Sequence, residues 1–176
     1  MKEVYTPYEA ILPCGGKGLR MKSNGEEIVI KPLLKVAGKE LIRYSLDNLP
    51  PHIISKLIVA TRSVEDVVHK WVQSSKLPYA NIVFSFLGDI PLMERINRTS
   101  VLLEGDYFAL CNTDEIRRGL NLTEVVEFHR KSNGLATMVI GYSDHLNEQR
   151  VVTIDENGRV THTTKNPEEY LRTPDV

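Results

Sequence analysis

The sequence has little of what marks several large classes of protein. Its 176 residues include only two cysteines, Cys14 and Cys111, which stand far apart and lack the short spacing of a metal-binding pair. This excludes a disulfide framework, and we expect two reduced thiols in a cytoplasmic protein. No apolar run is long enough to cross a bilayer, and residues 1–9 lack the apolar core of a signal peptide. We therefore expect no membrane partner.

Charge of one sign is not in excess either. The chain has 22 Lys and Arg against 23 Asp and Glu, for a formal net charge of −1, and the basic residues form no stripe. Nucleic-acid-binding proteins need a basic surface to neutralise phosphates, so we expect no nucleic-acid partner. The length suits one domain with a sizeable core, and there is no internal repeat or linker. We predict a single domain over residues 1–176.

Short apolar runs alternate with longer amphipathic ones along the chain. Continuous apolar runs are typical of strands covered on both faces, and apolar residues at helical spacing are typical of surface helices. Such alternation predicts an α/β fold, a three-layer α/β/α sandwich with a mainly parallel sheet, whose ligands bind where the strands end. The expected strands lie at 10–13, 57–60, 82–84, 107–111 and 137–142, and the expected helices lie at 41–49, 63–72 (capped by Ser63) and 121–129.

The last part of the chain has a different pattern. Residues 151–154 and 159–163 are strand-like and flank the dipeptide Asn157-Gly158. Because Asn-Gly favours the positive φ angles of a tight hairpin turn, we predict a C-terminal β-hairpin.

A glycine cluster follows the first expected strand, in the segment Leu12-Pro13-Cys14-Gly15-Gly16-Lys17-Gly18-Leu19-Arg20. Glycines at this place let the backbone turn tightly and present several N–H groups to an anion, and an arginine can bind phosphate oxygens in a bidentate way. The spacing is neither that of a dinucleotide-binding loop nor that of a P-loop. Taken alone, the cluster fits a purely structural turn as well as a phosphate loop.

A second compound motif changes this balance. Lys31-Pro32-Leu33 is followed by Val36-x-Gly38-Lys39-x-Leu41-Ile42. Together with the glycine cluster, this segment resembles the opening of the sugar-phosphate nucleotidyltransferases, whose sheet is Rossmann-like, of the GT-A type. Three later features follow in the family's order. Leu87-Gly88 is similar to the family's base-reading Leu-Gly, Asp114 to its magnesium-binding aspartate, and the segment with Lys165 to its Glu-Lys-Pro segment. The resemblance therefore runs from about residue 9 to residue 167.

The resemblance implies a definite reaction. The phosphate of a sugar 1-phosphate attacks the α-phosphorus of a nucleoside triphosphate, and pyrophosphate leaves, so catalysis depends on positioning and charge neutralisation. The implied catalytic residues are Arg20 on the β- and γ-phosphates, Lys31 between the α-phosphate and the acceptor, and Asp114 as ligand of the cofactor Mg²⁺. The implied substrate-binding residues are Leu12, Gly15, Gly16, Gly18, Gly88 and Lys165, the last on the acceptor phosphate.

Three departures from the family pattern bear on specificity and activity. Leu19 stands where the family usually has Thr or Ser, and Asp89–Met93 stand where it usually has small residues, which leaves the base open. The chain also ends soon after Lys165, before a second metal-binding aspartate of the family; Asp175 is not assigned that role. We expect a short or C-terminally truncated member, whose acceptor side is missing or comes from another subunit of a homo-oligomer.

Several alternatives stay open. One is a non-catalytic nucleotide-binding or regulatory module of the same fold, and another is a cytidylyltransferase that acts on a non-sugar alcohol phosphate. A third is a GT-A-type glycosyltransferase, but Thr113-Asp114-Glu115 lacks the Asp-x-Asp spacing of that class. From the residues alone, Lys31 could also be a surface lysine, and Asp114 could merely cap a turn.

Overall fold

The computed structural model describes residues 8–15, 30–63, 66–141 and 151–165. Its contacts divide the chain into two compact units, Met1–Glu127 and Phe128–Val176. A compact unit of this kind can be a whole domain or only part of one. The single domain expected from the chain length therefore stays a prediction. No helix in the described ranges is both long and apolar enough for a membrane span.

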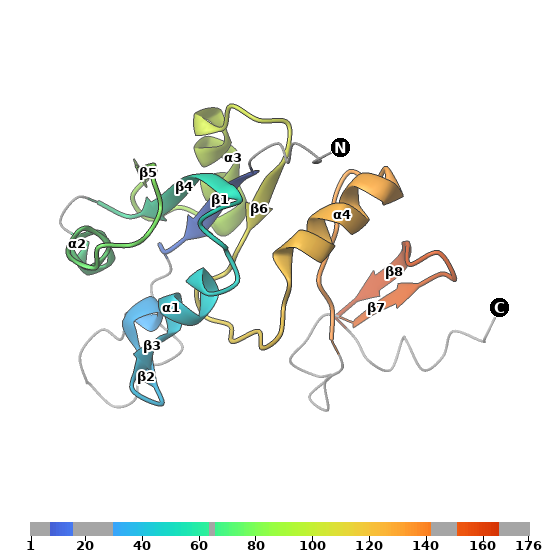
Figure 1. The fold of residues 1–176 in the computed structure, drawn as a ribbon, viewed down its shortest axis with the longest axis horizontal. Helices are drawn as coiled ribbons and strands as arrows, with labels where there is room; N and C mark the ends of the chain where they lie inside the picture. The colour runs from blue at the N-terminus through green and yellow to red at the C-terminus, as the bar shows by residue number, and fades with distance from the viewer. Residues whose placement is uncertain (1–7, 16–29, 64–65, 142–150, 166–176) are drawn as a thin grey trace. The chain divides into compact units, whose positions relative to one another are not determined.

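The first unit is built on a four-stranded parallel sheet (Figure 1). Its strands are β1 (Tyr8–Pro13), β4 (Ile54–Thr61), β5 (Ile82–Phe86) and β6 (Phe108–Leu110), in the order β5-β4-β1-β6. β1 therefore pairs with β4 on one side and with β6 on the other. The predicted parallel sheet is confirmed. Before β4, the chain forms a 3₁₀ turn η2 (Lys31–Leu33) and a small antiparallel pair, β2 (Lys35–Val36) and β3 (Lys39–Glu40).

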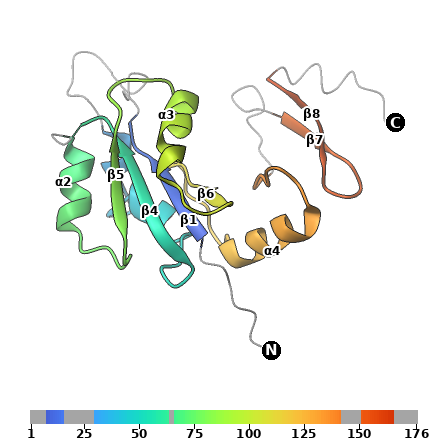
Figure 2. The ribbon, with the colours of Figure 1, turned by 90° about the horizontal axis from the view of Figure 1, so that it is seen from above.

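Helices cover both faces of this sheet, as Figures 1 and 2 show together. α1 (Leu41–Leu46) and α2 (Val67–Ser74) lie on one face, and α3 (Leu92–Thr99) lies on the other, against β1 and β4. The strand order explains this, because the chain moves outward from β1 to β5 and then crosses back to β6, and right-handed crossovers in opposite directions lie on opposite faces. The predicted three-layer arrangement is confirmed. A 3₁₀ turn η3 (Ser100–Leu102) follows α3, and α4 (Leu122–Ser132) follows β6.

The main hydrophobic core lies between the sheet and the helices α1 and α2. Register places Ala10 beside Leu57 and Leu12 beside Val59, and all four side chains are fully buried there. Helical residues such as Ile42, Leu46, Val68 and Val72 complete the core, and Cys14 and Cys111 are buried in it as free thiols. The expectation of reduced cysteines in confined places agrees with this.

The opposite face of the sheet carries a buried ion pair. The Glu9 carboxylate contacts Lys56 Nζ at 2.8 Å, and both side chains are more than nine-tenths buried. Glu9 also accepts hydrogen bonds from the backbone N–H groups of Glu104 and Gly105, at 2.8 Å each, while Lys56 also contacts the Glu104 carboxylate at 2.6 Å. Burial acts to raise the pKa of Glu9, but the hydrogen bonds from Lys56 and from the two backbone N–H groups outweigh it and hold the pKa below its ordinary value.

Local details differ from the sequence prediction in three places. α2 begins at Val67 with Asp66 as its N-cap, whose carboxylate accepts from the Val68 N–H at 2.8 Å, so the prediction that Ser63 caps this helix was wrong. Helix α3 was not predicted, because the residues that it buries are Arg95 and Thr99 rather than an apolar stripe. Within the predicted strand 137–142, residues 137–141 form no strand, and their apolar side chains are largely exposed.

The second unit contains the predicted hairpin. β7 (Val151–Ile154) and β8 (Val160–Thr164) pair antiparallel. In the turn, Asp155 Oδ1 accepts from the N–H groups of Asn157 at 3.0 Å and of Arg159 at 2.8 Å, and Gly158 adopts φ +75°. This positive φ is the conformation that glycine adopts without steric cost, so the turn residues specify the hairpin.

The buried ion pair gives a test of the fold. Lys56→Met keeps most of the side-chain volume but leaves the Glu9 carboxylate buried beside no cation, so the free energy of unfolding should fall by about 3–5 kcal/mol. Lys39→Met is the matched control, since its partner Asp47 is exposed, and it should cost about 0–1 kcal/mol. Urea unfolding followed by circular dichroism measures both, and equal costs would contradict a structural role for the Glu9–Lys56 pair.

Candidate functional site

The carboxyl ends of all four parallel strands meet at one edge of the first unit. Gly15 follows β1, Thr61 ends β4, Gly88 follows β5, and Asp114 follows β6. Sheets of this kind bind their ligands outside this edge, where the strand order reverses. Here the strand order reverses between β1 and β6, because β4 and β5 lie on the other side of β1. Gly15 and Asp114 therefore follow the two strands that flank the switch.

Two predicted catalytic residues come together at this edge. Lys31 Nζ lies 3.5 Å from Asp114 Oδ2, although the residues are 83 positions apart in the sequence. Lys31 opens the 3₁₀ turn η2, in which Pro32 is buried and fixes the backbone at the start of the turn. Both side chains of the pair are partly open to solvent, at 34% for Lys31 and 46% for Asp114. A pair so exposed contributes little to stability, and each group can turn to a ligand.

The segment that carries Asp114 is held by two partly buried hydrogen bonds. Thr113 Oγ1, in a residue only 4% exposed, donates to the carbonyl of Pro13 at 3.2 Å. Ser45 Oγ, in α1, donates to the carbonyl of Asn112 at 2.8 Å. One bond thus ties the segment to the end of β1 and the other ties it to α1. Asp114 therefore projects from a fixed support, which a turn that merely ends a strand would not need.

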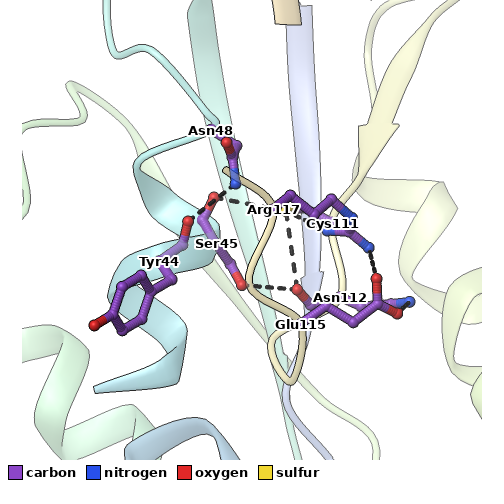
Figure 3. Close-up of polar contacts among 7 residues, drawn as sticks. All are labelled: Tyr44, Ser45, Asn48, Cys111, Asn112, Glu115 and Arg117. Carbon is purple, nitrogen blue, oxygen red and sulfur yellow. Dashed lines mark hydrogen bonds and ion pairs between the residues drawn. The ribbon is translucent and has the colours of Figure 1, made fainter. Parts of the chain in front are cut away.

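Figure 3 shows the polar contacts around this support. Arg117 forms an ion pair with Glu115 and also donates to Cys111 Sγ at 3.9 Å, while Asn112 Nδ2 donates to Glu115 at 3.0 Å. The Cys111 thiol in turn points at the carbonyl of Ser45, at 3.6 Å. These contacts close the segment 111–117 on itself and on α1, so the residue after Thr113 has a defined direction.

Neither cysteine near this edge is suited to act as a nucleophile. Burial raises the pKa of the Cys111 thiol, although Arg117 acts in the opposite direction. Burial likewise raises the pKa of Cys14 to about 12. Because the thiolate is the reactive form, both groups stay inert near neutral pH. The chemistry of this edge is therefore that of charged and backbone groups.

Gly88 occupies a position that favours glycine. Its φ is +62°, its N–H donates to the carbonyl of Arg62 at 2.9 Å, and its carbonyl accepts from Arg95 Nη2 at 2.8 Å. A side chain at this φ would be strained. Both backbone polar groups of Gly88 bond within the protein, so this glycine sets the course of the loop that leaves β5.

The remaining predicted site residues are placed as follows. The Leu12 side chain is fully buried in the core, so a ligand could meet only its backbone. Gly16, Gly18 and Arg20 lie outside the described residues. Lys165 directly follows β8 in the second unit and is exposed. The binding roles of all these residues stay predictions.

The described residues offer a metal ion little beyond Asp114. In the ranges that the structure describes, no three His, Cys, Asp or Glu side chains gather as a ligand set. Mg²⁺ commonly takes only one or two carboxylates and completes its shell with phosphate oxygens and water. Asp114 already holds a cation, the Lys31 ammonium, so its charge and position fit such an ion.

Sequence reasoning missed the residues that support the site. Ser45 lay within the expected helix 41–49 without any role assigned to it, and nothing marked Arg95. The signal available for Ser45 was a hydroxyl on an otherwise apolar face, because a buried hydroxyl needs a partner. The partner itself, a carbonyl in another strand's loop, cannot be identified from spacing.

Comparison with solved structures gives the fold a name. The chain is similar to a CMP:2-keto-3-deoxy-manno-octonic acid synthetase complexed with CTP, with a TM-score of 0.67 at 16% identity over 95% of this chain and 67% of the other. It is also similar to the inositol-1-phosphate CTP transferase from T. maritima, with a TM-score of 0.63 at 18% identity over 96% of this chain and 66% of the other. The chain has the nucleotidyltransferase fold.

A third structure with the nucleotidyltransferase fold agrees with this. A nucleotidyl transferase from Methanothermobacter thermautotroptrophicus matches with a TM-score of 0.54 at 22% identity, over 69% of this chain and 57% of the other. The chain spans about two thirds of the length of the first two structures and less of the third. No protein-family model matches the sequence, and neither does any curated protein.

The hydrogen bond from Ser45 and the exposed Lys31–Asp114 pair should respond differently to substitution. Ser45→Ala removes the hydroxyl that donates to the partly buried carbonyl of Asn112 and should lower the free energy of unfolding by about 1 kcal/mol. Asp114→Asn removes one exposed charge and should change it by less than about 1 kcal/mol. Denaturant unfolding of both variants is the measurement. A larger cost for Asp114→Asn than for Ser45→Ala would mean that Asp114 serves the fold rather than a ligand.

Proposed function

We propose that this chain transfers a nucleotidyl group from a nucleoside triphosphate to a phosphate-bearing acceptor and releases pyrophosphate. The observation that carries the proposal is the meeting of Lys31 and Asp114, at 3.5 Å, on the sheet edge where Gly15 follows β1. A cation, a carboxylate and the glycine cluster that begins at Gly15 (called the glycine turn below) supply the charges and backbone donors that stabilise phosphoryl transfer. The nucleotidyltransferase fold of the similar structures supports the same reaction class.

The reaction itself needs no side-chain nucleophile. An oxygen of the acceptor phosphate forms a bond to the α-phosphorus, and the bond from the α-phosphorus to the bridging oxygen of pyrophosphate breaks. Backbone N–H groups of the glycine turn at Gly15, Gly16 and Gly18 would hold the triphosphate, and Arg20 would neutralise the departing β- and γ-phosphates. Lys31 would lie between the two phosphates that react and offset their repulsion.

Asp114 is the residue that would hold Mg²⁺. When bound, the ion would act as a Lewis acid and neutralise phosphate charge. The carboxylate lies 3.5 Å from the Lys31 ammonium, so its position already suits a cation. Lys165 would contact the acceptor phosphate.

A sugar 1-phosphate is our first candidate acceptor, because the two sequence motifs resemble the sugar-phosphate nucleotidyltransferases. A non-sugar alcohol phosphate is the second candidate, and the similarity to an inositol-1-phosphate CTP transferase specifically favours it. The names of two similar structures mention CTP, so CTP is the first nucleotide to test. A nucleotide-binding module without turnover is the remaining alternative, and the predictions below separate it from an enzyme.

Triphosphate binding should stabilise the chain. A ligand at about ten times its dissociation constant adds about 1.4 kcal/mol to the free energy of unfolding, which in a domain of this size raises the melting temperature by roughly 3–6 °C. Thermal unfolding with Mg²⁺ and millimolar CTP, ATP, GTP or UTP measures this. If none of the four shifts the transition, the chain does not bind nucleoside triphosphates and the proposal fails.

Turnover should depend on the Asp114 carboxylate. Asp114→Asn keeps the size of the side chain but weakens its hold on a hard cation, so a loss of about 3 kcal/mol of transition-state stabilisation should lower the rate about a hundredfold. Pyrophosphate release with CTP and a panel of sugar 1-phosphates and alcohol phosphates is the assay. Asp106→Asn, an exposed acid just before β6, is the control and should match wild type. If Asp114→Asn turns over as fast as the wild type, Asp114 is not part of the active site. If the wild type binds triphosphate but shows no turnover, the chain is a non-catalytic nucleotide-binding module.

A further inference from the structure

Helix α3 buries a cation and exposes apolar side chains. Arg95 is only 2% exposed and faces the sheet, whereas Leu92 and Met93 on the same helix are 49% and 73% exposed. This reverses the usual preference, in which apolar side chains are buried and arginine is among the residues least often fully buried. Burying a guanidinium costs free energy unless hydrogen bonds and an opposite charge compensate for it, so the position of Arg95 calls for a physical reason.

The Arg95 guanidinium connects three of the four strand ends at the site edge. Nη1 donates to the carbonyl of Thr61 at the end of β4, at 3.0 Å, and Nη2 donates to the carbonyl of Gly88 after β5, at 2.8 Å. The guanidinium also lies against Gly15, because a methyl group built at Gly15 would come within 2.2 Å of Arg95 Cζ. Arg95 therefore fills the space that a side chain at Gly15 would need, and it links the segment after β1 to the end of β4 and the loop after β5.

The charge of Arg95 is not neutralised by a carboxylate among the described side chains, none of which forms an ion pair with it. Burial lowers the pKa of Arg95, and the more distant Asp89 acts in the opposite direction. An arginine stays protonated nevertheless, so a positive charge lies directly against the backbone of Gly15. In a site of low dielectric, such a charge attracts an anion more strongly than a solvated one does.

We propose that Arg95 is a positioning residue for the triphosphate. Its two hydrogen bonds and its contact with Gly15 hold the segment after β1 and the loop after β5 relative to each other, and its charge adds attraction for phosphates at this edge. This inference rests on the proposed function, but it concerns a residue that neither the sequence motifs nor the Lys31–Asp114 pair includes. The competing interpretation is that Arg95 only anchors α3 to the sheet.

The test is the affinity for CTP with Mg²⁺, measured by calorimetry at a temperature at which every variant is folded. Arg95→Lys keeps the positive charge but loses the paired hydrogen bonds to the carbonyls of Thr61 and Gly88, and should weaken CTP binding about tenfold. Arg95→Met loses the charge as well as these hydrogen bonds and should weaken CTP binding about a hundredfold. Arg98→Lys and Arg98→Met are matched controls, since Arg98 lies on the same helix, is 57% exposed and pairs with Glu94. Both should bind CTP within about twofold of wild type.

A comparison of CTP with CMP separates positioning of the triphosphate from anchoring of the helix. If Arg95 serves the phosphates, Arg95→Lys should lose affinity for CTP and keep its affinity for CMP within about twofold. Equal losses for both ligands, or CTP binding as tight as in wild type, would overturn the proposal. If the wild type does not bind CTP, both the proposed function and the role of Arg95 fail. If the wild type and Arg95→Lys bind CTP equally tightly, only the role of Arg95 fails.

A measurement on the wild-type chain covers the case in which the Arg95 variants do not fold. The Arg95 side chain is only 2% exposed and its guanidinium donates to two carbonyls, so its hydrogen-bonded protons should exchange slowly and their NMR signal can be followed. Addition of CTP and Mg²⁺ should shift this signal, and addition of cytidine, which has no phosphate, should leave it unchanged. A signal that responds equally to both, or to neither while CTP binds, would contradict the proposal.

Discussion

The pairing of β1 with β4 on one side and with β6 on the other is the constraint on which the rest of the structure depends. All three strands run parallel, so the segments that leave them must meet at one edge of the sheet. Gly15, at the end of β1, therefore lies at the same edge as Asp114, which follows β6. The Thr113–Pro13 hydrogen bond joins these two segments directly. The site is thus a consequence of strand order, and its charged residues come from segments far apart in the sequence.

The two faces of the sheet serve different purposes. The face covered by α1 and α2 is apolar and supplies most of the hydrophobic stabilisation, with Ala10 and Leu12 at its centre. The face covered by α3 carries polar groups at both ends of the strands: the Glu9–Lys56 pair at the amino edge and the Arg95 guanidinium at the carboxyl edge. The polar groups of this face hold loops in place, which apolar contacts between strands and helices cannot do.

Much of this could be predicted from the sequence, for identifiable reasons. Continuous apolar runs marked β1 and β4, and Asn157-Gly158 marked the C-terminal hairpin. The contact between Lys31 and Asp114 could be expected only from the resemblance of two motifs, because no spacing rule connects residues so far apart. Helix α3 was not predictable from periodicity, since its buried residues are Arg95 and Thr99. The cap of α2 was placed wrongly because both Ser63 and Asp66 are good capping residues, and local sequence alone does not choose between them.

The proposed reaction depends on a triphosphate that binds at the carboxyl edge of the sheet, beside Lys31 and Asp114. The most direct measurement is a crystal structure of the chain with CTP and Mn²⁺ in place of Mg²⁺, with the metal located by its anomalous scattering. We expect a metal peak at the Asp114 carboxylate and an α-phosphate beside Lys31 Nζ, with the β- and γ-phosphates near Gly15. A triphosphate bound instead in the pocket that Lys39, Arg43 and Tyr79 line below α1, with no metal at Asp114, would contradict it.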